Sequence, residues 1–366
     1  MNVELGQIVH RGTHATGKRR AEARRCPWTR RIVTILRGLV LAMLCMATPA
    51  AAQDAVFEAI RDVESAMARI GYRLATANAP LCDRLAPGLG LVLHTPEQYA
   101  PALRDQAVRH FGFAGPVGVE AVIAGSPAAA AGVEPDDTLL GIGTARFATE
   151  APEAAASTAS LIRAEAQIAA LPADTPLELH GQRSGKDYVR TIAPVPACRT
   201  RFEVAIGPDF TAKADGDMVQ IGSRFFEDYP EEQVAAAIAH EFAHNILRHR
   251  ERLEVLGVSF GLMSGLGRNV RYFRQTELEA DILSVALLAN AGYDPDAAVR
   301  FWEDFGPRHA GGILRSRSHP AWRDRLATIA AAIAALGPDR PARPAIVDSR
   351  DRPLDGDWQS LLVRAR

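Results

Sequence analysis

Residues 235–249 read AAAIAHEFAHNILRH and hold three of the chain's ten histidines. The run belongs to a segment, residues 230–252, that we predict to be helical. His240 and His244 are four residues apart, so their rings lie on one helical face and can meet at one point. Two imidazoles at this spacing suit a zinc ion. The alternative is an alanine-rich core helix that carries its histidines by chance.

The residues between and after these histidines define the expected chemistry. Glu241 is rotated by about 100° from His240, so it is a poor ligand but can reach a water beside the metal as a general base. His249 is nine residues after His240, which puts it on the opposite face unless the helix ends early. Leu247 and Arg250 stand where another class of zinc peptidase has a glycine and a third histidine, and this excludes that class.

A second motif supplies the missing ligand, because zinc needs more than two protein ligands. Residues 277–281 read ELEAD and lie on a second predicted helix, residues 277–291. Glu277 and Asp281 share one helical face, whereas Glu279 is about 200° away. We predict that Glu277 is the third ligand of one zinc ion per chain, and that Asp281 orients a ligand imidazole. The two motifs together favour a metal site over the core helix.

Composition and charge narrow the class of protein. The 366 residues are 48% hydrophobic and 23% charged, which is ordinary for a globular chain of two or three domains. The net charge of −1 hides an asymmetry, because residues 1–52 hold nine Lys and Arg against two Asp and Glu. The remainder carries a charge of about −8, which argues against a nucleic-acid partner.

Residues 1–52 resemble a bacterial export signal: arginines, an apolar stretch over 32–47, then small residues. We expect cleavage after Ala52 and a periplasmic mature chain. The alternative is an inner-membrane anchor through residues 32–47, but Arg37 interrupts this stretch and a spanning helix needs about 20 residues. No later segment is long and apolar enough, so we expect no stable membrane span in the mature chain.

Cleavage would remove Cys26 and Cys45 and leave Cys82 and Cys198 in an oxidising compartment. We therefore predict a disulfide between the remaining two cysteines. In the chain-entropy treatment, closing this loop would stabilise the folded state by roughly 4–5 kcal/mol. The alternative is a pair of unpaired thiols.

The periodicities predict an α+β fold. A helix is expected over 53–79, with Gly71 as a possible stop, and then a β-rich module over 80–198 whose hairpin turns at Ser184-Gly185. Residues 199–336 form the mainly helical domain with a small sheet, whose strands flank a turn at Asp215-Gly216. Further helices are expected over 295–305 and 320–335. The proline-rich, charged residues 337–366 predict a loosely ordered tail.

The β-rich module resembles a PDZ domain of the kind attached to bacterial proteases, through the run SPAAAAGVEPDDTLLGI at residues 126–142. This family usually has Gly-Asp where Asp136-Asp137 stand. The stretch PGLGLVL at residues 87–93 is similar to its carboxylate-binding loop, which implies a C-terminal peptide ligand at Gly88, Leu89, Gly90 and Leu91. The alternative is a module that only spaces or regulates the catalytic part.

Residues 202–336 resemble the M48 family of zinc metallopeptidases, of the HtpX, Oma1 and CaaX-protease type. The likeness rests on AHEFAHNILRH, on RQTELEAD at 274–281 and on SHPAWRDRL at 318–326. It implies a zincin-type domain in which His240, His244 and Glu277 bind zinc and Glu241 is catalytic. It also implies that His319 and Arg325 lie near the active site and stabilise the oxyanion. From the residues alone, His319 before Pro320 is more typical of a helix entry.

Two functions follow from these observations. The first is a zinc endopeptidase of the bacterial cell envelope that hydrolyses misfolded or envelope proteins. The second is a PDZ-type binding or chaperone-like protein with a structural or latched zinc site. Structural sites usually have four protein ligands, and His319 is the candidate for the fourth.

Overall fold

The computed structural model describes residues 49–148, 154–258, 269–309 and 319–365. The apolar stretch 32–47, Cys26 and Cys45 lie outside these residues, as does most of the expected export segment. All contacts discussed below lie within Arg61–Arg366, which belong to the larger of the chain's two compact units. The architecture is α+β, as the periodicities predicted.

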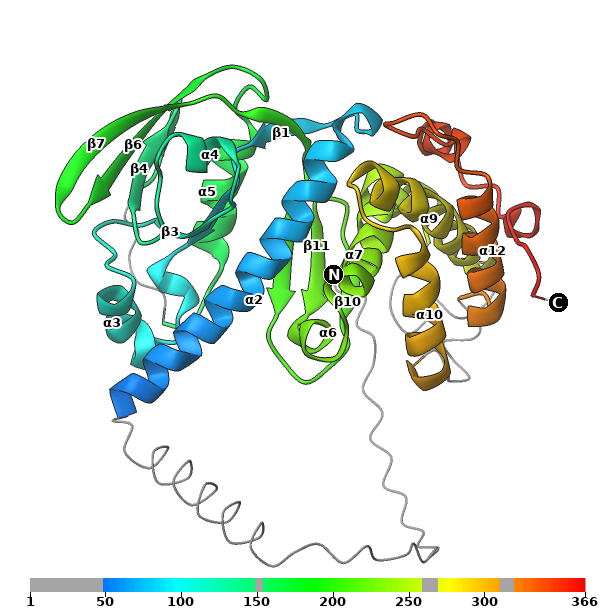
Figure 1. The fold of residues 1–366 in the computed structure, drawn as a ribbon, viewed down its shortest axis with the longest axis horizontal. Coiled ribbons are helices and arrows are strands. Elements are labelled where there is room, and N and C mark those ends of the chain that lie inside the picture. Colours follow the sequence, from blue (N-terminus) through cyan, green and yellow to red (C-terminus); the bar gives the residue numbers. More distant parts are fainter. Residues whose placement is uncertain (1–48, 149–153, 259–268, 310–318, 366) are drawn as a thin grey trace, which may run out of the picture. The chain divides into compact units, whose positions relative to one another are not determined.

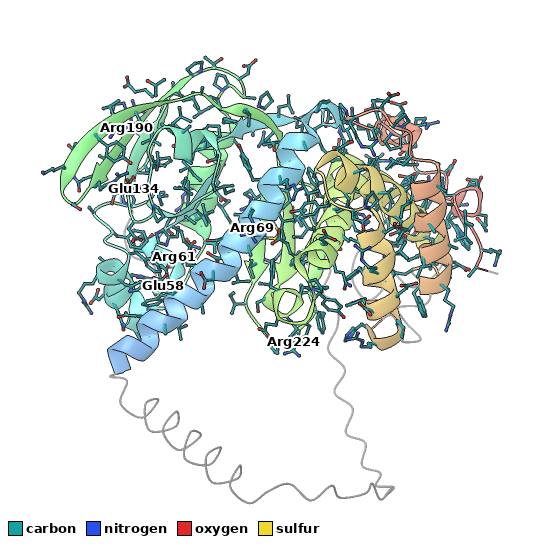
Figure 2. The ribbon with its side chains drawn as sticks, viewed as in Figure 1. Glu58, Arg61, Arg69, Glu134, Arg190 and Arg224 are labelled. Carbon is teal, nitrogen blue, oxygen red and sulfur yellow. A yellow bond between two sulfur atoms is a disulfide. The ribbon has the colours of Figure 1, made fainter. Side chains whose placement is uncertain are left out.

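The first described helix, α2 (Pro49–Ala77), begins before the expected cleavage position. The prediction that Gly71 stops it is wrong, because Gly71 lies inside the helix. A Cβ at this position would lie 2.4 Å from the Phe202 ring, so the glycine allows close packing. Arg61 and Arg69, both labelled in Figure 2, project from α2 and pair with Asp136 (2.5 Å) and Glu231 (2.7 Å). The helix therefore contacts both the β-rich and the helical part.

The β-rich part is built around one antiparallel six-stranded sheet, visible in Figure 1. Its strand order is β2-β3-β4-β6-β7, and β5 pairs with β4. The strands are β2 (Leu91–His94), β3 (Gly118–Val122), β4 (Thr138–Ile142), β5 (Ala145–Arg146), β6 (Leu177–Arg183) and β7 (Lys186–Ile192). The helices are η1 (Ala79–Leu81), η2 (Pro96–Gln98), α3 (Pro101–His110), α4 (Pro127–Ala130) and α5 (Ala159–Ala169). Apolar residues of these strands and of α4 and α5 form a separate core cluster.

Two turns of this part follow from residue chemistry. Ser184 and Gly185 both have positive φ, 50° and 76°, as a two-residue hairpin between β6 and β7 requires. Asp136 takes the left-handed conformation (φ 67°), which aspartate tolerates better than most residues. Asp136 therefore stands where the family that the module resembles usually has glycine. The neighbouring Asp137 can then form buried hydrogen bonds.

A two-stranded sheet and a disulfide close the β-rich part on itself. β1 (Leu85–Gly88) pairs antiparallel with β8 (Val195–Cys198). Cys82 and Cys198 are joined in a disulfide with a Cα–Cα distance of 5.5 Å across 116 positions of sequence. The two ends of the part are thus held together where the helical domain begins.

The helical domain opens with a three-stranded sheet of β9 (Arg201–Ala205), β10 (Ala212–Ala214) and β11 (Met218–Gly222). The Asp215-Gly216 turn joins β10 to β11, and Gly216 has φ 101°. The sequence predicted β9 and β11 as the strands flanking this turn and missed β10. β9 instead pairs in parallel with β11.

Helices bury the segment that carries His240 and His244. α7 and α9 pack side by side, and Figure 1 shows them next to each other in the domain. Fully buried alanines on α7, including Ala235, Ala239 and Ala243, permit this close packing. The helices are α6 (Ser223–Asp228), α7 (Glu231–Ile246), α8 (His249–Val255), α9 (Val270–Asn290), α10 (Asp296–His309) and α12 (Trp322–Ala334).

The C-terminal residues correct the prediction of a loosely ordered tail. They form η4 (Ala345–Asp351) and η5 (Trp358–Ser360), which pack against α9. Val347 and Leu354 are buried, and the backbone N–H of Gly356 donates to Gln275 Oε1 at 2.8 Å. The charge and proline content suggested disorder, but a few apolar residues anchor this segment to the domain.

Candidate metal centre

Three predicted ligands converge between α7 and α9. His240 and His244 occupy successive turns of α7, and Glu277 faces them from α9. The Nε2 atoms of the two imidazoles are 3.3 Å apart. Glu277 carboxylate oxygens lie 3.5 Å from His240 Nε2 and 3.7 Å from His244 Nε2.

These donors fit a zinc ion. Ligand atoms of His240, His244 and Glu277 all lie within 4.8 Å of one another. A tetrahedral zinc ion with ligands about 2.0–2.1 Å away separates its donors by roughly 3.3–3.4 Å. The observed separations are close to this value, and two imidazoles with one carboxylate form a donor set that zinc accepts in catalytic sites.

Glu241 lies beside this group and lines the same cavity of about 390 Å³. Burial raises the pKa of Glu241 to about 7, despite the opposing effect of His240. A carboxyl group with a pKa near neutrality is suited to exchange protons as a general base and acid. The cavity also contains aromatic side chains from α6 and α10, including Phe225, Phe301 and Phe305.

Asp281 contacts the predicted ligand His240, and Arg325 contacts the predicted ligand Glu277. Asp281 Oδ1 lies 3.1 Å from His240 Nδ1, the nitrogen that faces away from the predicted metal position. Arg325 on α12 donates to both oxygens of Asp281 at 2.7 Å, and it lies 3.0 Å from Glu277 Oε2. Burial alone would raise the pKa of Asp281, but the Arg325 guanidinium outweighs it and lowers that pKa. Arg325 therefore favours the ionised form of Asp281 and also contacts Glu277.

His319 is the least buried member of the site. Its side chain is 36% exposed, and its Nε2 lies 3.6 Å from Glu277 Oε1. It lines the cavity together with Pro320 and Trp322. The structure thus brings His319 to the cavity that the three converging side chains line.

The prediction that His249 lies on the opposite face is wrong, because the helix ends early. α7 stops at Ile246, Arg248 takes a left-handed conformation (φ 51°), and α8 begins at His249. This break turns the His249 ring back toward the centre, where its Nδ1 lies 2.8 Å from His244 Nδ1. His249 therefore contacts a predicted ligand without being one of the three converging donors.

Glu279 and Arg252 are site residues that the sequence reasoning missed. Glu279 Oε2 lies 2.9 Å from His249 Nε2, and Arg252 Nη1 donates to the same oxygen at 2.6 Å. Their side chains are only 2% and 6% exposed. Glu279 lies within the apolar pattern of α9, and a charged side chain on a buried face usually has a partner. The sequence could therefore have predicted a buried ion pair at Glu279.

The residues predicted to bind a peptide lie elsewhere, at the edge of the six-stranded sheet. Gly88 ends β1, Leu91 begins the edge strand β2, and Leu89 and Gly90 connect them. Gly90 has φ 76°, and a Cβ there would also meet Ser126. These residues line a cavity of about 460 Å³ whose other wall includes residues of α5.

Comparison with known proteins agrees with the metal-site geometry. Residues 251–333 match peptidase family M48, a range that includes Glu277 and Asp281 and begins after His244. The chain is similar to the mitochondrial metalloendopeptidase OMA1 of Schizosaccharomyces pombe, with 28% identity over 120 residues, 27% of this chain and 36% of the relative. It is also similar to the mitochondrial metalloendopeptidase OMA1 of Arabidopsis thaliana, with 30% identity over 118 residues, 27% of this chain and 24% of the relative.

Both similarities cover well under two thirds of the relatives' own length. Within residues 49–148, 154–258, 269–309 and 319–365, no helix is both long and apolar enough to cross a membrane. The matched range lies in the helical domain that carries the converging donors. Residues 251–333 of this chain are therefore similar to peptidase family M48.

Proposed function

We propose that the chain is a zinc-dependent metalloendopeptidase that hydrolyses peptide bonds of misfolded or envelope proteins. The observation that carries the proposal is the convergence of His240, His244 and Glu277 beside Glu241 in one cavity. A zinc ion held by these three side chains would supply Lewis acidity to the scissile carbonyl and to the attacking water.

The chain's own residues carry the proton transfers. Glu241 accepts a proton from the attacking water and delivers it to the leaving amine. Asp281 fixes the orientation of the His240 ring, and Arg325 keeps Asp281 ionised. His319, at the exposed side of the cavity, donates a hydrogen bond to the carbonyl oxygen as negative charge develops on it.

The direct test is Glu241→Gln, assayed on an unfolded protein such as casein together with the zinc content. We expect at least a 100-fold loss of hydrolysis with zinc retained, because proton transfer is lost while the ligands remain. Glu232→Gln is the matched control, since Glu232 lies on the same helix but is exposed and pairs with Arg300. Full hydrolysis by the Glu241 variant would exclude the mechanism.

The second candidate is a binding protein with a latched zinc site. It is favoured by the 3.6 Å distance between His319 and Glu277, which brings a fourth donor near the other three. His319→Ala separates the two functions in the same casein assay. A loss of hydrolysis supports a catalytic His319, a gain indicates a latch, and no hydrolysis by either protein supports the binding function.

We also propose that the cavity between β2 and α5 binds a peptide C-terminus, with Gly88, Leu89, Gly90 and Leu91 along one wall. An edge strand with an adjacent apolar cavity is the arrangement that strand addition requires. Fluorescent peptides with free or amidated C-termini test this directly. Equal binding of both forms would contradict a carboxylate-binding role and favour a spacer.

Export to the periplasm, with cleavage near Ala52, completes the proposal. The Cys82–Cys198 disulfide supports it, because disulfides persist in oxidising compartments. The alternative is an inner-membrane anchor through residues 32–47. Cell fractionation with N-terminal sequencing distinguishes them, since a membrane-bound protein that retains residues 1–52 would contradict cleavage.

A further inference from the structure

The two imidazole ligands differ in what holds the nitrogen that faces away from the metal position. His240 Nδ1 meets a carboxylate directly, at 3.1 Å from Asp281. His244 Nδ1 instead meets a second imidazole, at 2.8 Å from His249 Nδ1. The opposite nitrogen of His249 lies 2.9 Å from Glu279 Oε2. A carboxylate therefore stands behind each ligand, but on one side it acts through an intervening ring.

We propose that His249 and Glu279 are positioning residues that fix the tautomer and orientation of the metal ligand His244 through consecutive hydrogen bonds. This inference rests on the metal site of the proposed function. It assigns a role to residues outside the three ligands and the general base.

The protons along this path follow from the geometry. His244 Nε2 faces the other donors, so a neutral His244 bound through that atom carries its proton on Nδ1. His244 Nδ1–H then donates to His249 Nδ1. His249 must carry its own proton on Nε2, and it donates this proton to Glu279. Each ring has one donor and one acceptor, so the path has a single consistent direction.

The Glu279 carboxylate accepts hydrogen bonds from three further side chains. Arg252 donates to its two oxygens at 2.6 and 3.4 Å, and Gln275 Nε2 donates to Oε1 at 2.9 Å. The Ser349 hydroxyl, from the C-terminal segment, donates to Oε2 at 3.3 Å. Because these contacts come from α8, α9 and η4, the carboxylate cannot turn away from His249 without breaking contacts in three elements.

The break between α7 and α8, just before His249, determines where the His249 ring lies. Arg248 takes a left-handed conformation, which is unfavourable for a non-glycine residue. Its guanidinium pairs with Asp83, next to the disulfide-bonded Cys82. A continuous helix would carry His249 away from His244, so the break is what brings the two rings together.

The test measures zinc affinity by competition with a chelating dye, independently of peptidase activity. We expect His249→Leu to weaken zinc binding by about 10–100-fold, the range seen when residues behind a metal ligand are removed. We expect about a tenfold loss in Glu279→Gln, where the His249 ring remains but its charged acceptor is gone. The matched control is His94→Leu, which removes an equally buried histidine of the β-rich part and should leave zinc affinity unchanged.

Two further measurements separate positioning from a merely structural role. The visible absorption of the cobalt-substituted protein reports ligand geometry, and it should shift in His249→Leu but not in His94→Leu. His249→Asn can present its side-chain oxygen near the position of Nδ1, so we expect it to recover part of the affinity. This smaller polar variant also covers the case in which His249→Leu does not fold.

The outcomes are distinguishable from those of the proposed function. If the wild-type protein binds no zinc, the proposed function fails and this inference with it. If the wild-type protein binds zinc and both His249 variants match its affinity and cobalt spectrum, only the positioning role is overturned. If His249→Asn binds no better than His249→Leu, the hydrogen bond to His244 is not the cause of the loss.

Discussion

At the scale of single residues, the metal centre depends on charges that are buried only because they are paired. Arg325 is 4% exposed and lies between Asp281 and Glu277, and it also packs over the Trp302 ring at 4.1 Å. A buried ion pair gives little net stability, but removing one partner leaves the other charge uncompensated in a low-dielectric region. The guanidinium therefore matters most when the metal is absent and nothing else neutralises the carboxylates.

We predict that Arg325→Met lowers the free energy of unfolding of the zinc-free protein by about 3–5 kcal/mol. Urea unfolding in the presence of a chelator measures this change. Arg308→Met is the matched control, because Arg308 pairs with Asp304 at 3.9 Å and both are about half exposed, so the expected change is under about 1 kcal/mol. Similar losses in the two variants would contradict the role given to Arg325.

The sequence predicted the converging residues and Asp281 beside His240, but not the contacts of His249 and Glu279 beside His244. His240, His244, Glu277 and Asp281 follow from four-residue helical spacing, which fixes a shared face without any knowledge of the fold. His249 could not be placed in this way, because its position depends on a helix break at Arg248. No glycine, asparagine or proline occupies that position, and the contact with Asp83 that accompanies the break is distant in sequence.

At the scale of elements, the β6–β7 hairpin is held to the preceding turn by one buried carboxylate. Asp137 accepts hydrogen bonds from Arg183 at 2.6 and 2.7 Å, from Tyr188 at 2.7 Å and from the Glu134 backbone at 2.9 Å. Burial alone would raise the pKa of Asp137, but these donors outweigh it and hold that pKa below its usual range. The ionised carboxylate thus stabilises the β-rich part, and protonation removes this stabilisation.

We predict that Asp137→Asn lowers the free energy of unfolding by about 2–3 kcal/mol at pH 7. A depressed carboxyl pKa gives stability that is present above the unfolded-state value and is lost as the pH falls through the folded-state value. The difference between wild type and variant should therefore shrink as the pH falls below about 4. Denaturant unfolding at pH 7, 5 and 3 measures this difference.

The control for this prediction is Asp187→Asn on the same hairpin. Asp187 is exposed, and its side chain accepts a hydrogen bond from the Gln182 amide. A change under about 0.5 kcal/mol is expected there. A difference between wild type and Asp137→Asn that is constant from pH 7 to 3 would contradict an ionised, hydrogen-bonded Asp137.

The elements themselves were predicted where local chemistry determines them. The hairpin at Ser184-Gly185 and the helices α10 and α12 appear at the expected places. β10 was missed because Ala212–Ala214 has little strand propensity of its own and is defined by its pairing with β11. The ordered tail was missed for a related reason, since its stability comes from contacts with α9 that composition does not reveal.

At the scale of the larger compact unit, several ion pairs join the β-rich part to the helical domain. α2 contacts both parts through Arg61 and Arg69, and Arg84 near the disulfide pairs with Glu251 on α8 at 3.2 Å. Arg350 of the C-terminal segment donates to the Leu81 carbonyl at 2.6 Å. Most of these contacts are exposed and individually weak. The Cys82–Cys198 disulfide instead joins the two ends of the β-rich part, next to the start of the helical domain.

We predict that the double variant Cys82→Ser, Cys198→Ser loses about 4–5 kcal/mol of unfolding free energy, because the disulfide closes a loop across 116 positions and restricts the unfolded chain. Urea unfolding with and without a thiol reductant measures the loss. The reductant should destabilise the wild type by a similar amount and leave the double variant unchanged. Since the disulfide acts mainly on the unfolded state, zinc affinity of the folded double variant should stay within about threefold of the wild type. A large loss of zinc affinity in a variant that remains folded would instead mean that the disulfide holds the Asp83–Arg248 contact and, through it, the His249 ring.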